Sequence, residues 1–74
     1  MPTRIDSDCL KKKAGKSAWL EGHYNPDCYL YKNEKGFYLR SIPGWARRLK
    51  DGDIICIDEG ITSERVRRYQ LELK

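Results

Sequence analysis

The stretch that most constrains the fold is residues 54–57, where the apolar side chains Ile-Ile-Cys-Ile follow one another without interruption. A short continuous apolar run bounded by turn signals is typical of a strand that is buried on both faces. Residues 51–53, Asp-Gly-Asp, provide such a turn signal directly before it. The sequence therefore predicts a central strand at residues 54–57, on which the other elements pack.

The tail after residue 60 permits two interpretations. Tyr69, Leu71 and Leu73 alternate with polar residues, which is typical of a strand with one face in water. Residues 62–64, Thr-Ser-Glu, open instead like a capped helix. We favour the strand, because it would pair with residues 54–57 as a final hairpin and close the sheet.

A hairpin is the clearest local prediction. Residues 28–32 and 37–42 are rich in aromatic and aliphatic side chains, as strands are. Residues 33–36, Asn-Glu-Lys-Gly, suit a tight turn that ends in glycine. Alternation leaves aromatic rings on both faces of this hairpin, so one face can fill a core while the other stays at least partly exposed.

Shorter elements are expected on either side of the hairpin. Asp6 or Ser7 can cap a short helix over residues 9–14, and residues 16–21 read as a short strand around a tryptophan. After the hairpin, helical spacing of apolar residues predicts a single helical turn over residues 45–49.

These elements predict one small, mainly β domain over residues 1–74, with residues 1–8 poorly ordered. We expect a five-stranded, mostly antiparallel barrel or strongly bent sheet of SH3-like or OB-like size, with one or two short helical turns. Aromatic side chains bury about 150–250 Å² each, so a few of them can hold so small a core together. Where alternation is ambiguous, the opposite face of a strand is the alternative for the core. The expected core is Trp19, Leu20, Leu30, Phe37, Leu39, Trp45, Leu49, Ile55, Ile57, Val66, Leu71 and Leu73.

Basic residues are concentrated in the first part of the chain. Residues 1–50 carry eleven Lys and Arg against five Asp and Glu, whereas residues 51–74 carry four against six, and the net charge is +4. Cations interleaved with aromatic rings are typical of surfaces that bind single-stranded nucleic acid, with stacking worth about 1–3 kcal/mol per base. The sequence thus predicts a nucleic-acid surface made of Lys11, Lys12, Lys13, Lys16, Tyr29, Tyr31, Tyr38, Arg40, Arg47 and Arg48.

A protein partner is the main alternative. Exposed Trp, Tyr and Arg are the residue types of interface hot spots, and an open sheet edge can add a partner's strand or pair with a second copy of the chain. Trp19 and Tyr24 would mark such a site. The protein would then be an inhibitor or adaptor of a larger complex. Homodimerisation through an open sheet edge is compatible with either hypothesis.

Metal binding and catalysis find little support in the sequence. Cys9, His23, Cys28 and Cys56 include no Cys-x₂-Cys pair that would form half of a zinc site. A single His and the absence of a Gly-rich phosphate loop leave no constellation for an enzyme. We therefore predict no catalytic residue, no metal and no cofactor.

Targeting signals are also missing from the sequence. It has no apolar N-terminal run typical of a signal peptide and no stretch long enough to span a membrane. Three cysteines fit no compact disulfide framework. The expectation is a cytoplasmic protein with reduced thiols and no membrane contact.

Overall fold

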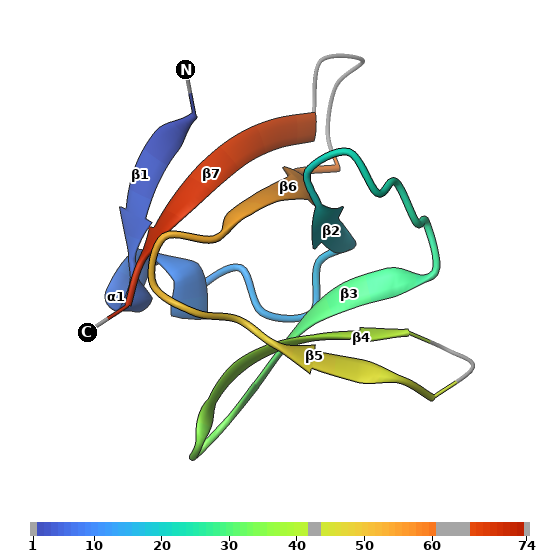
Figure 1. The fold of residues 1–74 in the computed structure, drawn as a ribbon, viewed down its shortest axis with the longest axis horizontal. Coiled ribbons are helices and arrows are strands. Elements are labelled where there is room, and N and C mark those ends of the chain that lie inside the picture. Colours follow the sequence, from blue (N-terminus) through green and yellow to red (C-terminus); the bar gives the residue numbers. More distant parts are fainter. Residues whose placement is uncertain (1, 42–43, 61–65, 74) are drawn as a thin grey trace.

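Strands dominate the computed structural model, which describes residues 2–41, 44–60 and 66–73. The prediction of a mainly β fold is confirmed. The described residues contain seven strands in two sheets, where the sequence predicts five strands in a barrel or bent sheet. Figure 1 shows an upper sheet, β1-β7-β6-β2, above a lower sheet, β3-β4-β5. The elements are β1 (Thr3–Asp6), α1 (Ser7–Lys11), β2 (Ala18–Leu20), β3 (Cys28–Asn33), β4 (Gly36–Ser41), β5 (Ala46–Arg48), β6 (Ile54–Asp58) and β7 (Val66–Glu72).

The strand β6 lies inside the upper sheet, between β7 and β2, as the apolar run predicts. Its residues Ile55, Cys56 and Ile57 are buried. The tail forms β7, which pairs antiparallel with β6, so the strand interpretation is confirmed. The cap-like residues 62–64 lie outside the described residues.

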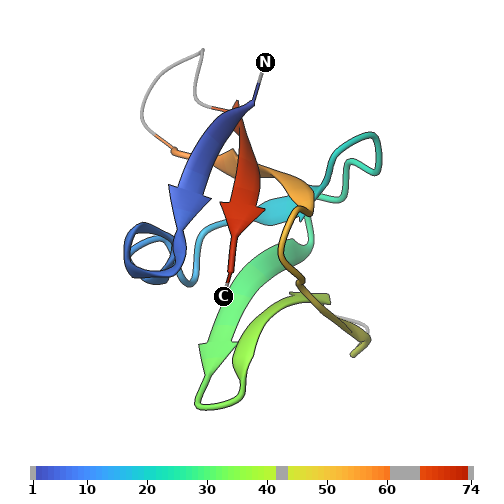
Figure 2. The same ribbon diagram turned by 60° about the vertical axis from the view of Figure 1, so that its left-hand side comes forward.

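The first strand, β1, has no counterpart in the prediction, which expects little order in residues 1–8. It pairs in parallel with β7, with Ile5 opposite Leu71, and both side chains are buried. Figure 2 shows the two strands side by side and pointing the same way. A strand with one apolar residue gives no periodic signal, because its position depends on an edge supplied by the far end of the sequence.

The predicted short helix forms as α1, but it spans Ser7–Lys11, whereas the sequence predicts residues 9–14. Asp6 caps it by accepting a hydrogen bond from the Cys9 amide over 2.9 Å, and this bond holds the pKa of the Asp6 carboxyl below its ordinary value. Leu10 anchors the helix in the core, as so short a helix requires. No helix among the described residues is long and apolar enough to cross a membrane.

The predicted hairpin is confirmed as β3 and β4. Asn33 pairs with Gly36 across the turn, and the Asn33 side chain accepts hydrogen bonds from the amides of Lys35 and Gly36. Gly36 has a φ of +145°, a backbone conformation that residues other than glycine rarely adopt. The turn therefore fixes the register of β3 against β4.

The predicted helical turn over residues 45–49 is wrong. Residues Ala46–Arg48 form β5, which pairs antiparallel with β4. Leu49 is buried as expected, but Trp45 is 46% exposed. Trp45 and Leu49 have helical spacing, but the residues between them pair with the open edge of β4 and form a strand instead.

The predicted strand at residues 16–21 is confirmed as β2, and this stretch connects the two sheets. Residues Ala18–Leu20 pair with β6 in the upper sheet. Just before them, Ser17 forms an isolated bridge with Tyr29, and the Leu30 amide donates to the Lys16 carbonyl over 2.9 Å. The chain thus leaves the edge of the lower sheet and enters the upper sheet within a few residues.

The core between the sheets contains most of the expected residues. Trp45 and Val66 are exposed instead, so their assignment to the core is wrong. The prediction is confirmed for buried Trp19, Leu30, Phe37, Leu39, Leu49, Ile55, Ile57 and Leu71, and for partly buried Leu20 and Leu73. The residues that it omits are Ile5, Leu10, Ala18, Cys28, Cys56 and Tyr69.

Candidate nucleic-acid interface

The lower sheet has one face in the core and one outer face in solvent. Cys28, Leu30, Phe37 and Leu39 point into the core. Because side chains alternate along a strand, the intervening residues point outward. The outer face, as named below, consists of Tyr29, Tyr31, Tyr38, Arg40, Ala46 and Arg48.

Two cross-strand rows organise the outer face. In one row Tyr31 lies opposite Tyr38, which lies opposite Arg48. In the other, Arg40 lies between Tyr29 and Ala46. The three tyrosines are half-buried, so their rings are held by neighbours while part of each surface stays accessible. Five of the ten residues that the sequence assigns to a nucleic-acid surface are thereby brought together.

Aromatic and guanidinium groups contact one another on this face. The rings of Tyr31 and Tyr38 lie 6.3 Å apart between centroids, inclined by 51°. The Arg40 guanidinium carbon lies 4.8 Å from the centroid of the Tyr31 ring, within the range of a cation–π contact. These contacts position planar groups of the kinds on which unpaired bases stack.

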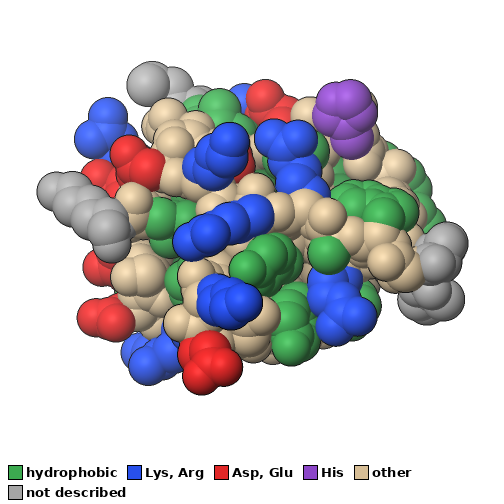
Figure 3. Space-filling view, turned by 60° about the horizontal axis from the view of Figure 1, so that its bottom comes forward, with side chains coloured by type: hydrophobic (Ala, Val, Ile, Leu, Met, Phe, Trp, Pro, Cys, Tyr) green, Lys and Arg blue, Asp and Glu red, His purple; other side chains and the backbone are tan. Residues whose placement is uncertain are grey.

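Basic charge is concentrated on the lower sheet. Residues 28–50 carry six Lys and Arg and one Glu, a balance of +5, and the rest of the chain carries nine and ten, a balance of −1. Strands β3, β4 and β5 contain no acidic residue. Figure 3 shows Lys and Arg side chains interspersed with hydrophobic ones on the side where the lower sheet lies, with acidic side chains toward the margins.

Three cations of the upper half of the molecule, Arg4, Lys13 and Arg68, are paired with carboxylates. Arg68 pairs with Glu21, and Arg4 lies 4.0 Å from Glu72. Within the described ranges, no ion pair reaches a cation of the lower sheet. The structure therefore leaves the charges of the lower sheet open to an external anion.

One end of the lower sheet has a basic pocket. It has a volume of about 480 Å³ and lies beside the β3–β4 turn. Arg48 donates to the Lys35 carbonyl over 3.1 Å, which fixes its guanidinium beside the turn. The pocket is lined by Ser7, Lys35, Gly36, Phe37, Arg48, Leu49, Lys50, Asp51 and Leu73. Three cations against one carboxylate suit this pocket to a phosphate group.

The remaining residues predicted for the nucleic-acid surface lie elsewhere. Lys11 and Lys12 are on or beside α1, which packs on β1 of the upper sheet. Lys16 borders the lower sheet through its backbone contact with β3. Arg47 lies opposite the core residue Leu39, so alternation directs it away from the outer face, although it is exposed at the sheet edge.

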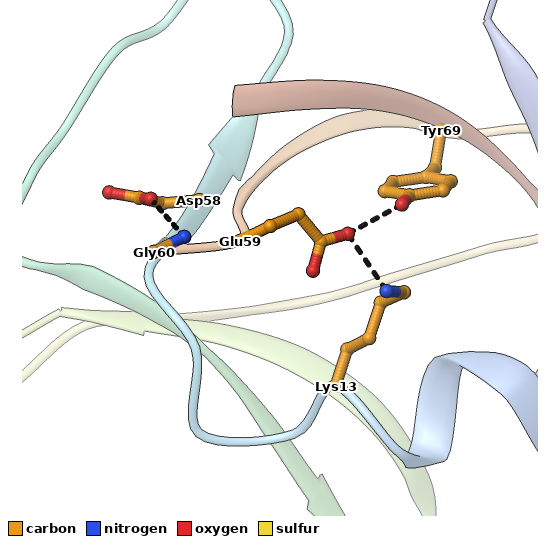
Figure 4. A network of polar contacts seen from close by, with 5 residues as sticks. All are labelled: Lys13, Asp58, Glu59, Gly60 and Tyr69. Carbon is orange, nitrogen blue, oxygen red and sulfur yellow. Dashed lines mark hydrogen bonds and ion pairs between the residues drawn. The ribbon is translucent and has the colours of Figure 1, made fainter. Parts of the chain in front are cut away.

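Lys13 is taken up by a network inside the fold, shown in Figure 4. The Glu59 carboxylate accepts hydrogen bonds from Lys13 Nζ over 2.8 Å and from the Tyr69 hydroxyl over 2.5 Å. Lys13 Nζ also lies 5.3 Å from the Tyr69 ring centroid. Sequence reasoning assigned Lys13 to a surface, because nothing in the pattern places Glu59 beside it.

The network shifts the pKa of each of its members. Burial alone would raise the pKa of Glu59, but the hydrogen bonds from Lys13 and Tyr69 outweigh it and hold that pKa below its ordinary value. The hydrogen bond to Glu59 raises the pKa of Lys13. Burial and then the bond to Glu59 raise the pKa of Tyr69. The charged pair therefore stabilises this junction over a wide pH range.

The structure brings Trp19 and Tyr24 of the alternative site together, but Trp19 is a core residue and only Tyr24 is exposed. Their rings meet edge to face, with centroids 4.8 Å apart. Trp19 is only 6% exposed, whereas Tyr24 is 71% exposed. Trp45 joins them in one pocket. Sequence reasoning placed Trp45 in the core, and the signal against that assignment was the Pro-Gly dipeptide directly before it, which is typical of a loop.

The cysteines are free thiols. Cys9 is exposed, and Cys28 and Cys56 are buried, as a small apolar residue inside β6 would be. Burial raises the pKa of both buried thiols. In the described part of the chain, no group of three or more His, Cys, Asp or Glu residues could hold a metal ion.

Comparisons with known proteins add no relative. No protein-family model, curated protein or solved structure matches the chain significantly. The functional argument therefore depends on the surface itself.

Proposed function

We propose that this protein is a non-enzymatic, cytoplasmic binding protein that takes single-stranded nucleic acid on the outer face of its lower sheet. The observation that carries the proposal is the register of β3, β4 and β5, which puts three tyrosines and two arginines on one face. No carboxylate belongs to these strands.

The basic and the aromatic side chains supply the two main contributions to the free energy of single-strand binding. Arginine and lysine neutralise phosphates and release counterions, which makes affinity fall with salt. Aromatic rings and guanidinium planes stack on bases without reading their sequence. A duplex hides its base faces, so the half-buried tyrosines favour a single strand over a duplex. DNA and RNA both offer these groups.

Fluorescence anisotropy with labelled single-stranded DNA, single-stranded RNA and duplex DNA, each at two salt concentrations, tests the proposal. We expect the single strands to bind more tightly than the duplex and to lose affinity steeply with salt. Arg48→Glu should weaken binding, since Arg48 is on the outer face. Arg67→Glu makes the same charge change on β7 of the upper sheet and is the matched control.

Two results would overturn the proposal. One is the absence of binding at low salt, which would favour a protein partner at the exposed rings of Tyr24 and Trp45. The other is equal weakening by both charge reversals, which would show attraction by net charge alone and no defined surface.

A further inference from the structure

A second pocket lies at the end of the lower sheet opposite the basic pocket. It has a volume of about 290 Å³. Trp19 provides a buried wall, and Tyr24 and Trp45 stand at its exposed side. Its lining is Trp19, Leu20, His23, Tyr24, Asn25, Cys28 and Trp45, and we call it the aromatic pocket.

The aromatic pocket adjoins the end of the lower sheet at which β3 begins, so a bound strand passes around this end of the sheet to reach the outer face. Cys28 begins β3, and the Ser41 amide at the end of β4 donates to the Trp45 carbonyl over 3.1 Å. Figure 1 shows the β2–β3 connection reaching this same end of the lower sheet. Tyr29 follows Cys28 directly, and at about 3.3 Å per residue along a strand Tyr31 lies only about 10 Å further on. Neighbouring nucleotides of an extended strand can span this distance.

The chemistry of the lining favours a neutral ring over a cation. The described residues that line it include no carboxylate, whereas a pocket for an ammonium group gains from one. Asn25 Oδ1 accepts a hydrogen bond from the Asp27 amide, so the Asn25 side-chain NH₂ is the group that can donate to a ligand. His23 adds a ring that can donate or accept. Stacking rings with a few polar groups are what an unpaired base requires.

The size of the aromatic pocket also favours a single base as the ligand. Pockets for drug-sized molecules measure about 300–1,000 Å³, so this pocket takes one small planar group. A folded protein partner would need a much larger contact area.

We propose that the aromatic pocket binds one unstacked nucleobase of a strand whose neighbouring nucleotides lie on the outer face. This inference rests on the proposed function. It gives the interface a direction, with phosphate contacts concentrated at the basic pocket and one base held at the other end of the lower sheet.

Intrinsic fluorescence can test this inference directly, because both tryptophans of the chain line the aromatic pocket. We would titrate the protein with a short oligothymidylate and with a series in which one nucleotide at a time is abasic. The intact strand should quench the tryptophans. An abasic nucleotide at one position should weaken binding about 5- to 140-fold, the equivalent of about 1–3 kcal/mol per stacked base.

Variants then separate the aromatic pocket from the outer face. Trp45→Ala should weaken binding of the intact strand and abolish the penalty of the abasic nucleotide, while Trp45→Phe keeps a ring and restores most of the affinity. Tyr24→Ala and Tyr24→Phe form a second pair. Both residues are exposed, so their substitution leaves the core intact. Trp19 is left unchanged, because its buried ring supports the fold.

The outcomes are distinguishable. If oligonucleotide binds and Tyr31→Ala weakens it, but Trp45→Ala and Tyr24→Ala do not, the inference about the aromatic pocket fails and the proposed function stands. If the wild-type protein binds no oligonucleotide, both fail. Quenching by tetramethylammonium without quenching by oligonucleotide would also overturn the inference and identify a cation site, as in a protein partner that carries a methylated lysine.

Discussion

Arg40 lies diagonally across the hairpin from Tyr31, and its guanidinium covers the tyrosine ring at 4.8 Å from the centroid. The ring holds the guanidinium plane in place, and the opposite side of that plane is where a base can stack. Arg40 therefore combines a fixed charge with a flat surface.

The two roles of Arg40 can be separated. Arg40→Lys keeps the charge and loses the plane, so we expect weaker binding of single strands with an unchanged salt slope. Arg40→Ala should also reduce the slope of log affinity against log salt by about 0.7. Anisotropy titrations over a salt series measure both quantities. Identical slopes for the two variants would contradict the assignment of Arg40 to a phosphate.

The Glu59 network predicts how stability depends on pH. The pKa of Glu59 is lower in the folded than in the unfolded chain, so its contribution is present above its ordinary pKa of 4.5 and is lost as the pH falls through the folded value. The pKa of Lys13 is raised, so its contribution is present below 10.5 and is lost as the pH rises through the folded value.

Substitution of Glu59 tests this linkage. Glu59→Ala should lower the free energy of unfolding at neutral pH by about 1–2 kcal/mol, because Lys13 and Tyr69 lose their acceptor. Glu59→Gln should flatten the loss of stability in acid, as urea denaturation at several pH values would show. Glu72→Gln is the control: Glu72 is more exposed and its ion pair is long, so little change is expected. Equal effects at both positions would contradict the role of the network.

Substitution of Ile5 tests how much β1 contributes to the stability of the fold. Its side chain is buried against β7, so Ile5→Ala should cost about 2–5 kcal/mol of unfolding free energy. Thr3→Ala, an exposed change in the same strand, should stay within about 0.5 kcal/mol. Denaturant titration gives both values, and a small effect of Ile5→Ala would mean that β1 detaches without cost.

The three thiols should react at different rates. Cys9 is exposed on α1, whereas burial protects Cys28 and Cys56 and raises the pKa of each. Since the thiolate is the reactive form, a maleimide should add once rapidly, with further additions only on unfolding. Mass spectrometry of the intact protein follows this course, and Cys9→Ser should remove the rapid step. Rapid addition to that variant would show that the core opens.

Local patterns predicted the elements that depend on neighbours in the sequence. The apolar run gave β6, and the turn at Asn33 gave the hairpin with the correct faces, which is why Tyr31 and Arg40 could be proposed together. β1 escaped prediction because it adds to the edge of β7, which is far away in the sequence. No periodicity in three or four residues records such an edge. β5 follows β4 closely, but it is only three residues long and the apolar residues around it have helical spacing.

The candidate site was likewise predictable only where it depends on local sequence. Its tyrosines and Arg40 lie in the predicted hairpin. The hydrogen bond that holds Lys13 at Glu59, away from the predicted surface, is a contact between distant segments. Trp45 was assigned to the core for its size and spacing, and only the pairing of β5 with β4 shows that it stands at the mouth of a pocket.

The parallel pairing of β1 with β7 has a consequence for the order of folding. Thr3 and Tyr69, which pair in it, are far apart in the sequence, so the closure of this pair costs more chain entropy than the closure of the β3–β4 hairpin. During synthesis the residues of the lower sheet also leave the ribosome before those of β7. The surface proposed to bind nucleic acid can therefore form on a nascent chain, before the upper sheet acquires its third and fourth strands.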